Sequence, residues 1–109
     1  FGTRVQAAAP SDAAGQDGGL RLHAVSPCGA GRGTWVAFEL PTAAAAQLEL
    51  FTIDGRRVRG LVHGRMGAGP RRLFWDGHDA SGRSVAAGVY VLRLQAGARE
   101  VRQKLVVTR

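Results

Sequence analysis

Two aspartates and a serine late in the chain come closest to a cation-binding pattern. Asp76, Asp79 and Ser81 carry oxygen atoms of the kind that Ca²⁺ binds. Their spacing differs from the D-x-D-x-D-G of an EF-hand, and no later glutamate completes a set of ligands. We therefore expect these side chains to bond the backbone of their own loop, and the sequence predicts no metal site.

The histidines and the single cysteine offer little further chemistry. His23, His63 and His78 are far apart in the sequence, and none has a histidine or cysteine at metal-ligand spacing. A nucleophilic pair would need a histidine and an orienting aspartate beside Cys28, which lies in a glycine-rich segment with no basic neighbour before Arg32. Pairing with a cysteine of another chain stays open, and acylation would require this cysteine at a mature N-terminus.

Glycine-rich stretches at residues 15–19 and 64–69 do not follow a buried strand and open a helix, so neither predicts a phosphate-binding loop. No pattern for a nucleophile, a metal or a phosphate is therefore present in the sequence. We expect no enzyme activity and no cofactor.

Basic residues outnumber acidic ones, with 15 Lys and Arg against 8 Asp and Glu and a formal net charge of +7. No acidic residue occurs between Gly55 and Trp75, where most of the excess lies. This segment predicts contact with an anionic partner, such as an acidic protein surface, anionic lipid head groups or lipopolysaccharide, with an ordinary solvated face as the alternative. The candidate contact residues are Arg56, Arg57, Arg59, Arg65, Arg71 and Arg72.

Nucleic acid is a poor candidate for that anionic partner. Proteins that bind single strands place exposed aromatic side chains between basic ones, so that bases can stack on them. Only Phe74 and Trp75 lie near the arginines, and we expect both in the hydrophobic core.

The chain has 109 residues, which is enough for one domain with a hydrophobic core. No apolar run approaches the roughly 20 residues of a membrane-spanning helix, so no transmembrane segment is predicted. Residues 1–19 are poor in apolar side chains and predict an unstructured or extended N-terminal tail or linker, and residues 20–109 predict the folded domain. The sequence begins at Phe1 without an initiator methionine, and a cleaved signal peptide would account for that start.

From Leu20 onward, apolar and polar residues alternate, and Gly, Pro or Asp clusters interrupt the alternation at short intervals. This pattern is typical of an all-β protein. The sequence Asp54-Gly55 predicts a hairpin turn. Residues 42–46 predict a loop or one helical turn, and residues 64–70 predict a loop. We expect an antiparallel β-sandwich of about seven strands, at residues 20–24, 34–40, 48–53, 57–62, 71–75, 89–94 and 100–108.

Several segments carry a resemblance to a known family. They are LELFTIDGRRVRGL (48–61), WDGHDASGRSVAAGVYVLRL (75–94) and REVRQKLVVTR (99–109), and the opening LRLHAVSPCGAGRGTWVAFELP (20–41) also fits. In order and spacing they resemble the bacterial Ig-like module of the flagellar hook-capping protein and the similar C-terminal sorting domain of type IX secretion cargo. The chain departs from the usual Pro-Asn-Pro of that module, where it has Pro27-Cys28-Gly29.

The central motif also has a structural explanation of its own. A large ring at the end of a short strand can fill the space between two sheets. Asp and Ser side chains can bond their own backbone in a turn, and glycine supplies a positive φ or a bend or bulge where a strand starts. The residues to which we assign such structural roles are Trp75, Asp76, Gly77, Asp79, Gly82, Gly88 and Tyr90.

The resemblance and the missing catalytic patterns predict a non-catalytic structural or interaction module outside the cytoplasm, in the periplasm, at the outer surface or secreted. We expect a small accessory subunit docked on protein partners in a larger, envelope- or membrane-associated assembly. Its contacts would come from the arginines and from the tail around Phe1, Val5 and Pro10. The alternatives are a sorting domain of a type IX-like secreted protein, a scaffold like the hook cap, and a carbohydrate-binding sandwich with Trp35 as its exposed ring.

Overall fold

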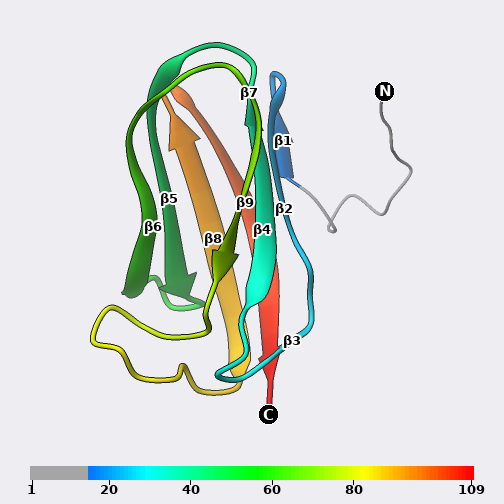
Figure 1. Ribbon diagram of the computed structural model, residues 1–109, viewed down its shortest axis with the longest axis vertical. Helices are drawn as coiled ribbons and strands as arrows, with labels where there is room; N and C mark the ends of the chain where they lie inside the picture. The colour runs from blue at the N-terminus through cyan, green and yellow to red at the C-terminus, as the bar shows by residue number, and fades with distance from the viewer. Residues whose placement is uncertain (1–14) are drawn as a thin grey trace.

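Two β-sheets pack face to face as a sandwich (Figure 1). The computed structural model describes residues 15–109, with side chains from residue 18 onward, and within these residues it contains nine strands and no helix. No helix in this part of the chain could therefore be long and apolar enough to cross a membrane. The strands are β1 (Gly15–Asp17), β2 (Leu20–Ala24), β3 (Cys28–Gly29), β4 (Thr34–Leu40), β5 (Ala44–Thr52), β6 (Arg57–Met66), β7 (Gly69–Trp75), β8 (Gly88–Ala96) and β9 (Arg99–Thr108).

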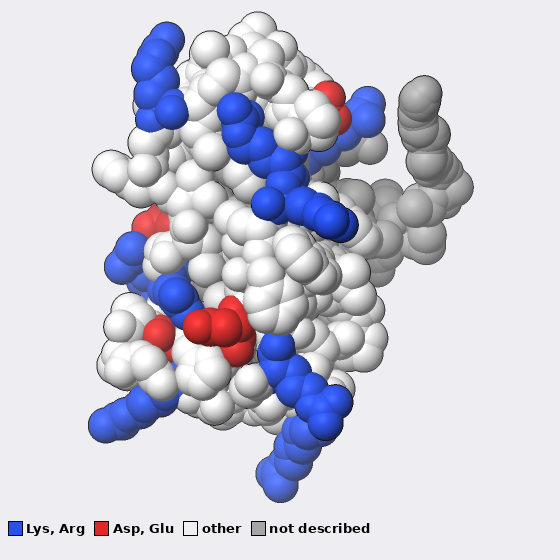
Figure 2. All heavy atoms as spheres, viewed as in Figure 1, with Lys and Arg blue, Asp and Glu red and all other residues white. Residues whose placement is uncertain are grey.

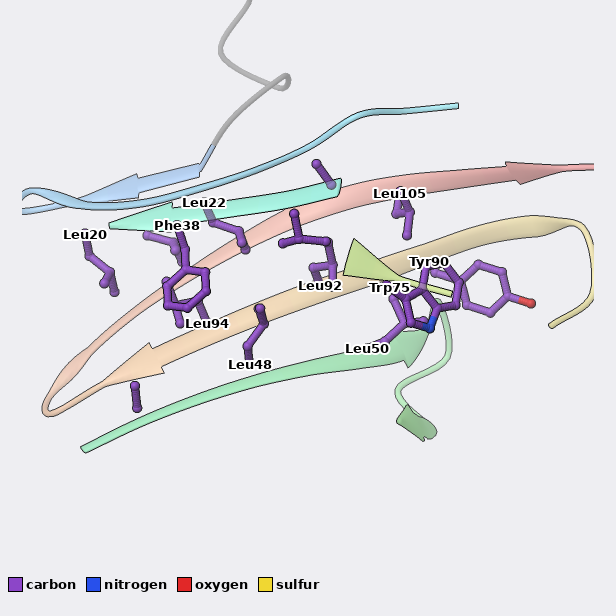
Figure 3. Close-up of a cluster of buried hydrophobic side chains, with 14 of the residues drawn as sticks. Leu20, Leu22, Phe38, Leu48, Leu50, Trp75, Tyr90, Leu92, Leu94 and Leu105 are labelled. Atoms are coloured by element: carbon purple, nitrogen blue, oxygen red, sulfur yellow. The ribbon is translucent and has the colours of Figure 1, made fainter. Parts of the chain in front are cut away.

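The four-stranded sheet has the order β1-β2-β4-β7, and the five-stranded sheet has the order β3-β9-β8-β5-β6. Their inward faces come from the alternation in the sequence: in β4, for example, Val36, Phe38 and Leu40 are buried while Trp35 is exposed. Figure 3 shows leucines of both sheets between the ribbons, with Trp75 toward one end of the core. The predicted all-β, Ig-like sandwich is confirmed, and each of the seven predicted strands is present.

Two segments predicted as loops belong mainly to strands instead. Residues 44–46 of the alanine run open β5, where Ala46 is buried and Ala44 lies opposite Met66 of β6. The other predicted loop is reduced to residues 67–68, because β6 and β7 extend into it from both sides. Alanine and glycine prefer strands only weakly, and here pairing with neighbouring strands overrides that preference.

Two short strands lie where the sequence shows no alternation. β1 falls inside the predicted tail and pairs with β2 through a turn at Gly18 and Gly19, whose φ values are 57° and 92°. β3 pairs in parallel with the end of β9, with Cys28 opposite Val107. Backbone pairing defines both strands, so a search for alternating side chains could not find them. The four-stranded sheet therefore starts ahead of the expected domain boundary at Leu20.

β6 and β7 are consecutive strands that form the outer edges of different sheets. Residues 67–68 connect them at one end. At the other end, Arg59 of β6 reaches Asp76, which directly follows β7, with 2.7 Å between Nη1 and Oδ1. Both edges therefore lie on the same side of the sandwich, and the predicted arginine cluster borders that side.

Candidate interaction surfaces

Hydrogen bonds hold the loop after β7 to the core and to β6. The indole Nε1 of Trp75 donates to the carbonyl oxygen of His78 at 3.0 Å. Asp76 Oδ1 accepts from the backbone N–H of His78 at 3.0 Å and from Arg59 Nη1 at 2.7 Å. The His78 N–H, and after it the Arg59 charge, hold the pKa of Asp76 below its usual value. This carboxylate therefore serves as a structural anchor for the loop.

Asp79 organises the next turn of the same loop. Its Oδ1 accepts from Ser81 Oγ at 2.6 Å, from the Ser81 N–H at 2.9 Å and from the Arg83 N–H at 3.0 Å. Gly82 follows at a φ of 90°. These bonds, the Ser81 hydroxyl first, lower the pKa of Asp79. Among the residues that the structure describes, no group of three or more His, Cys, Asp or Glu is placed to hold a metal ion.

Two glycines let the loops before β4 and after β7 touch backbone to backbone. Gly33 has a φ of 81°, and a Cβ built on it would lie 1.8 Å from the carbonyl oxygen of Trp75. Gly77 has a φ of 82°, and its Cβ would lie 3.0 Å from the backbone nitrogen of Gly33. Both the dihedral angle and the close approach therefore require glycine at position 33. This contact packs one loop against the strand end that carries the buried Trp75 ring.

Tyr90 fixes the start of β8. Its ring is buried, its hydroxyl donates to the carbonyl oxygen of Ala86 at 2.5 Å, and burial raises the pKa of that hydroxyl. Gly88 lies opposite Val107, and the pairing of β8 with β9 runs through all of β8 without a register shift. The bulge suggested at Gly88 is therefore not present in this ladder, although Gly88 has a positive φ of 157° at the start of the strand.

The candidate arginines do not form one patch of unpaired charge. Arg57 Nε bonds Glu49 Oε2 at 2.8 Å, and Arg59 holds the loop after β7 as described above. Arg71 Nη1 donates to the carbonyl oxygen of Gly67 at 2.7 Å. Figure 2 shows basic side chains spread along the viewed face with acidic groups among them. At least three of the six arginines therefore bind groups of their own chain.

Arg56 and Arg65 are exposed on the same hairpin. A hydrogen bond from the Thr52 hydroxyl and, more weakly, the Arg56 charge lower the pKa of Asp54 in the hairpin turn. Arg65 lies near the far end of β6 and makes no ion pair within residues 18–109. Arg65 is therefore the arginine of β6 whose charge is most available to a partner.

On the outer face of the five-stranded sheet, Glu49 joins two arginines. Arg93 Nη2 lies 2.9 Å from Glu49 Oε1, on the other oxygen from Arg57, and Arg93 Cζ lies 4.7 Å from the centroid of the Phe51 ring. Burial acts to raise the pKa of Glu49, but hydrogen bonds from Arg57 and Arg93 outweigh it and lower the pKa. Apart from Arg93 Nε, which is buried without a partner among the described residues, these groups satisfy one another.

The outer face of the four-stranded sheet is different, because it exposes aromatic rings. Trp35 of β4 is 47% exposed and lies opposite Phe74 of β7, which is 49% exposed. Their ring centroids are 5.3 Å apart, with 68° between the planes. Val25 is exposed and donates its N–H to the Trp35 carbonyl oxygen at 3.3 Å, and Arg72 Cζ lies 4.6 Å from the Trp35 ring centroid. We call Val25, Trp35, Arg72 and Phe74 the aromatic patch.

The position of Phe74 corrects the sequence-based expectation that this ring lies in the core. Successive residues of a strand face opposite sides of the sheet, so Phe74 and Trp75 cannot both point inward. Trp75 is the one that is buried, at 1% exposure. The alternation of β7 therefore contained the signal for the aromatic patch, and the expectation overlooked it.

The single cysteine and the N-terminal tail are the remaining features singled out in the sequence. Cys28 is buried against the end of β9, and burial raises the pKa of its thiol, which lowers the fraction of reactive thiolate. The tail residues proposed as contacts, Phe1, Val5 and Pro10, lie outside the described residues. Their role stays a prediction.

The chain is similar to one protein family. Residues 24–100 match the family model of the FlgD Ig-like domain, which confirms the resemblance to the flagellar hook-capping protein. A solved structure of FlgD from P. aeruginosa has the same fold, with a TM-score of 0.55 and 22% identity over 65% of this chain and 58% of that chain. No curated protein sequence matches the chain significantly. Since the family model covers most of its length, the chain belongs to the family of FlgD Ig-like domains.

Proposed function

We propose that this domain is a non-catalytic accessory module that docks on a protein partner in a larger assembly outside the cytoplasm, with the aromatic patch as its contact surface. The exposure of Trp35 and Phe74, side by side on one sheet face, carries the proposal. Tryptophan and arginine are enriched at the residues that dominate binding energy in protein interfaces. A carbohydrate platform would need an open ring face, and Arg72 covers one face of Trp35.

The patch has enough apolar surface to contribute substantially to binding. At about half exposure, each ring leaves on the order of 100 Å² in water. At about 25 cal/mol per Å², its burial by a partner would contribute roughly 2 to 3 kcal/mol per ring. The ladder between β4 and β7 holds both rings in register, so little ordering cost would accompany binding.

Family membership supports the structural part of the proposal. The FlgD Ig-like domain is a hook-cap-related module, and this chain carries that module over residues 24–100. The same relationship supports a place outside the cytoplasm and a role as an accessory subunit. The sorting-domain function remains the alternative, and it would assign the domain's function to an attached cargo.

Native mass spectrometry of the tagged chain, produced at its natural level in its own cells, tests the proposal. We expect the wild-type chain in a defined larger complex, and the double variant Trp35→Ala/Phe74→Ala at least tenfold depleted from it. Ile53→Ala is the matched control, because Ile53 is 73% exposed in the hairpin turn and away from the patch. A complex that retains the double variant would overturn the patch as contact surface. A chain found only at the end of a longer polypeptide would support the sorting domain.

A further inference from the structure

The edge of β7 next to the aromatic patch has unpaired backbone groups that can be identified. The N–H of Val25 bonds the carbonyl oxygen of Trp35, so the backbone groups of Trp35 point toward β2. Backbone direction alternates along a strand, so Thr34 and Val36 of β4 point toward β7, where they meet Trp75 and Leu73.

The intervening residues of β7 therefore direct their backbone groups away from the sheet. These are Pro70, Arg72 and Phe74, and proline is tolerated in strands at such positions because it has no N–H to donate. Among the described residues no strand pairs with this side of β7, since β7 is the last strand of its sheet. The edge offers the N–H and C=O groups of Arg72 and Phe74 to an added strand.

The other sheet edges are poorer templates. β1 and β3 are three and two residues long. β6 has register shifts opposite Leu48/Glu49 and Leu50/Phe51, and the N–H of Ala80 already occupies the carbonyl oxygen of Val58 at 3.2 Å. Bulges and covering loops are the usual means of blocking an edge. β7 pairs with β4 over seven residues without a shift, so it is the long regular edge among the described strands.

The side chains along this edge define the chemistry of its occupant. Arg72 and Phe74 are exposed on the outer face, and no acidic residue occurs between Gly55 and Trp75. A second copy of the chain would bring the same acid-free, arginine-rich segment, with a net charge of +7 on each copy. Opposite charges across a strand pair are favourable, and so are apolar contacts with an aromatic ring.

We infer that the open edge of β7 binds an extended acidic segment of the partner protein, which adds a fifth strand to the four-stranded sheet. An acidic side chain of that segment lies beside Arg72, and an apolar one lies beside Phe74. The inference rests on the proposed function and specifies the chemistry of the partner. It assigns the backbone of β7 a role that the aromatic patch alone does not require.

Amide NMR of the full chain with a designed peptide tests the inference. The probe is the capped eight-residue peptide Thr-Glu-Thr-Val-Thr-Glu-Thr-Val, whose Glu and Val share one face of an extended strand, as Arg72 and Phe74 do on β7. The control peptide has Lys in place of Glu. We expect the Glu peptide to slow hydrogen exchange at the Arg72 and Phe74 amides at least tenfold. The amide of Leu73, which already faces β4, serves as the internal control. Equal protection by the Lys peptide would contradict the charge preference.

Variants separate the edge from the aromatic patch. Arg72→Pro removes the backbone N–H of residue 72, whereas Arg72→Ala keeps it. We expect the Arg72→Pro variant to lose binding of the Glu peptide and the Arg72→Ala variant to be weakened only in part, which would assign the effect to the backbone. Equal binding by both would overturn the inference. If Arg72→Pro does not fold, Arg72→Glu is used in its place. We expect this variant to bind the Glu peptide at least tenfold more weakly than the wild type, and unchanged binding would contradict the inference. If the peptide does not bind the edge of β7 but the Trp35→Ala/Phe74→Ala variant is lost from the cellular complex, the inference about the edge is wrong and the proposed function still holds.

Discussion

The outer faces of the two sheets differ in whether their charged groups and aromatic rings find partners within the chain. On the five-stranded sheet, Glu49 binds Arg57 and Arg93, and Arg93 lies over Phe51. On the four-stranded sheet, Trp35 and Phe74 are half exposed, and the arginine over Trp35 has no carboxylate partner among the described residues. The charged groups of the first face are paired with one another within the chain, whereas the rings of the second face would bury the most apolar surface against a partner.

β6 and β7, the two edge strands on the same side of the sandwich, also differ in how available they are to a partner. β6 is interrupted by register shifts and touched by the loop after β7, while β7 is regular. Edge strands promote association unless they are disrupted or covered. A protein that blocks one of two adjacent edges and leaves the other regular is suited to bind at the second.

The largest difference should appear within one dipeptide of β7. Trp75→Ala removes a fully buried ring, and we expect about 3 to 5 kcal/mol of lost unfolding free energy. Phe74→Ala removes a half-exposed ring, and we expect less than about 1 kcal/mol. Chemical denaturation of both variants measures the contrast. Comparable losses would mean that Phe74 supports the fold and is no surface ring.

Gly33→Ala should have the next largest effect, because it acts on the loop that supports the end of β7. The new Cβ would collide with the carbonyl oxygen of Trp75, and alanine is strained at a φ of 81°. We expect a loss of about 2 to 3 kcal/mol by thermal or chemical unfolding. Gly55→Ala is the matched control, with a φ of 94° and open space around its Cβ. Equal losses in the two variants would show that the backbone contact adds nothing to the strain.

Charge reversal on β6 should distinguish a bound arginine from an available one. Arg57→Glu places a second carboxylate beside Glu49, and we expect a loss of about 1 kcal/mol in stability. Arg65→Glu has no such neighbour, and we expect a change within about 0.5 kcal/mol. Any weakening of the assembly by Arg65→Glu would then reflect partner contact, whereas an unchanged assembly would make Arg65 ordinary solvated charge.

Acid should weaken the ion pairs of Glu49 and the loop after β7, and leave the aromatic patch intact. Contacts in the folded state lower the pKa of Glu49, Asp76 and Asp79, so the unfolded chain takes up protons first as pH falls. Their contribution to stability is therefore complete above about pH 5 and declines below about pH 4, through the folded pKa values. Melting temperature against pH should show this decline. Glu49→Gln should flatten part of it, and an identical profile would argue against a role for Glu49.

Much of the fold could be predicted because alternation follows burial. The inward leucines of β2, β5 and β8 gave the sandwich, and the Trp75–Leu94 motif gave the family. The short strands β1 and β3 could not be predicted, since pairing to a neighbour and not side-chain pattern defines them. The partners of Arg59 and Arg93 also lie on distant chain segments that only the folded topology brings together. The aromatic patch could have been predicted from the sequence, because neighbouring strand residues such as Phe74 and Trp75 face opposite sides of the sheet.

Photo-crosslinking in the cell tests the contrast between the two faces most directly. A photoreactive phenylalanine analogue is placed either at Phe74, on the aromatic patch, or at Phe51, under Arg93 on the other face. We predict a crosslink to one defined protein partner from position 74 and none from position 51. Crosslinks from position 51 alone, or equal crosslinks from both positions, would contradict the assignment of the four-stranded face as the docking side.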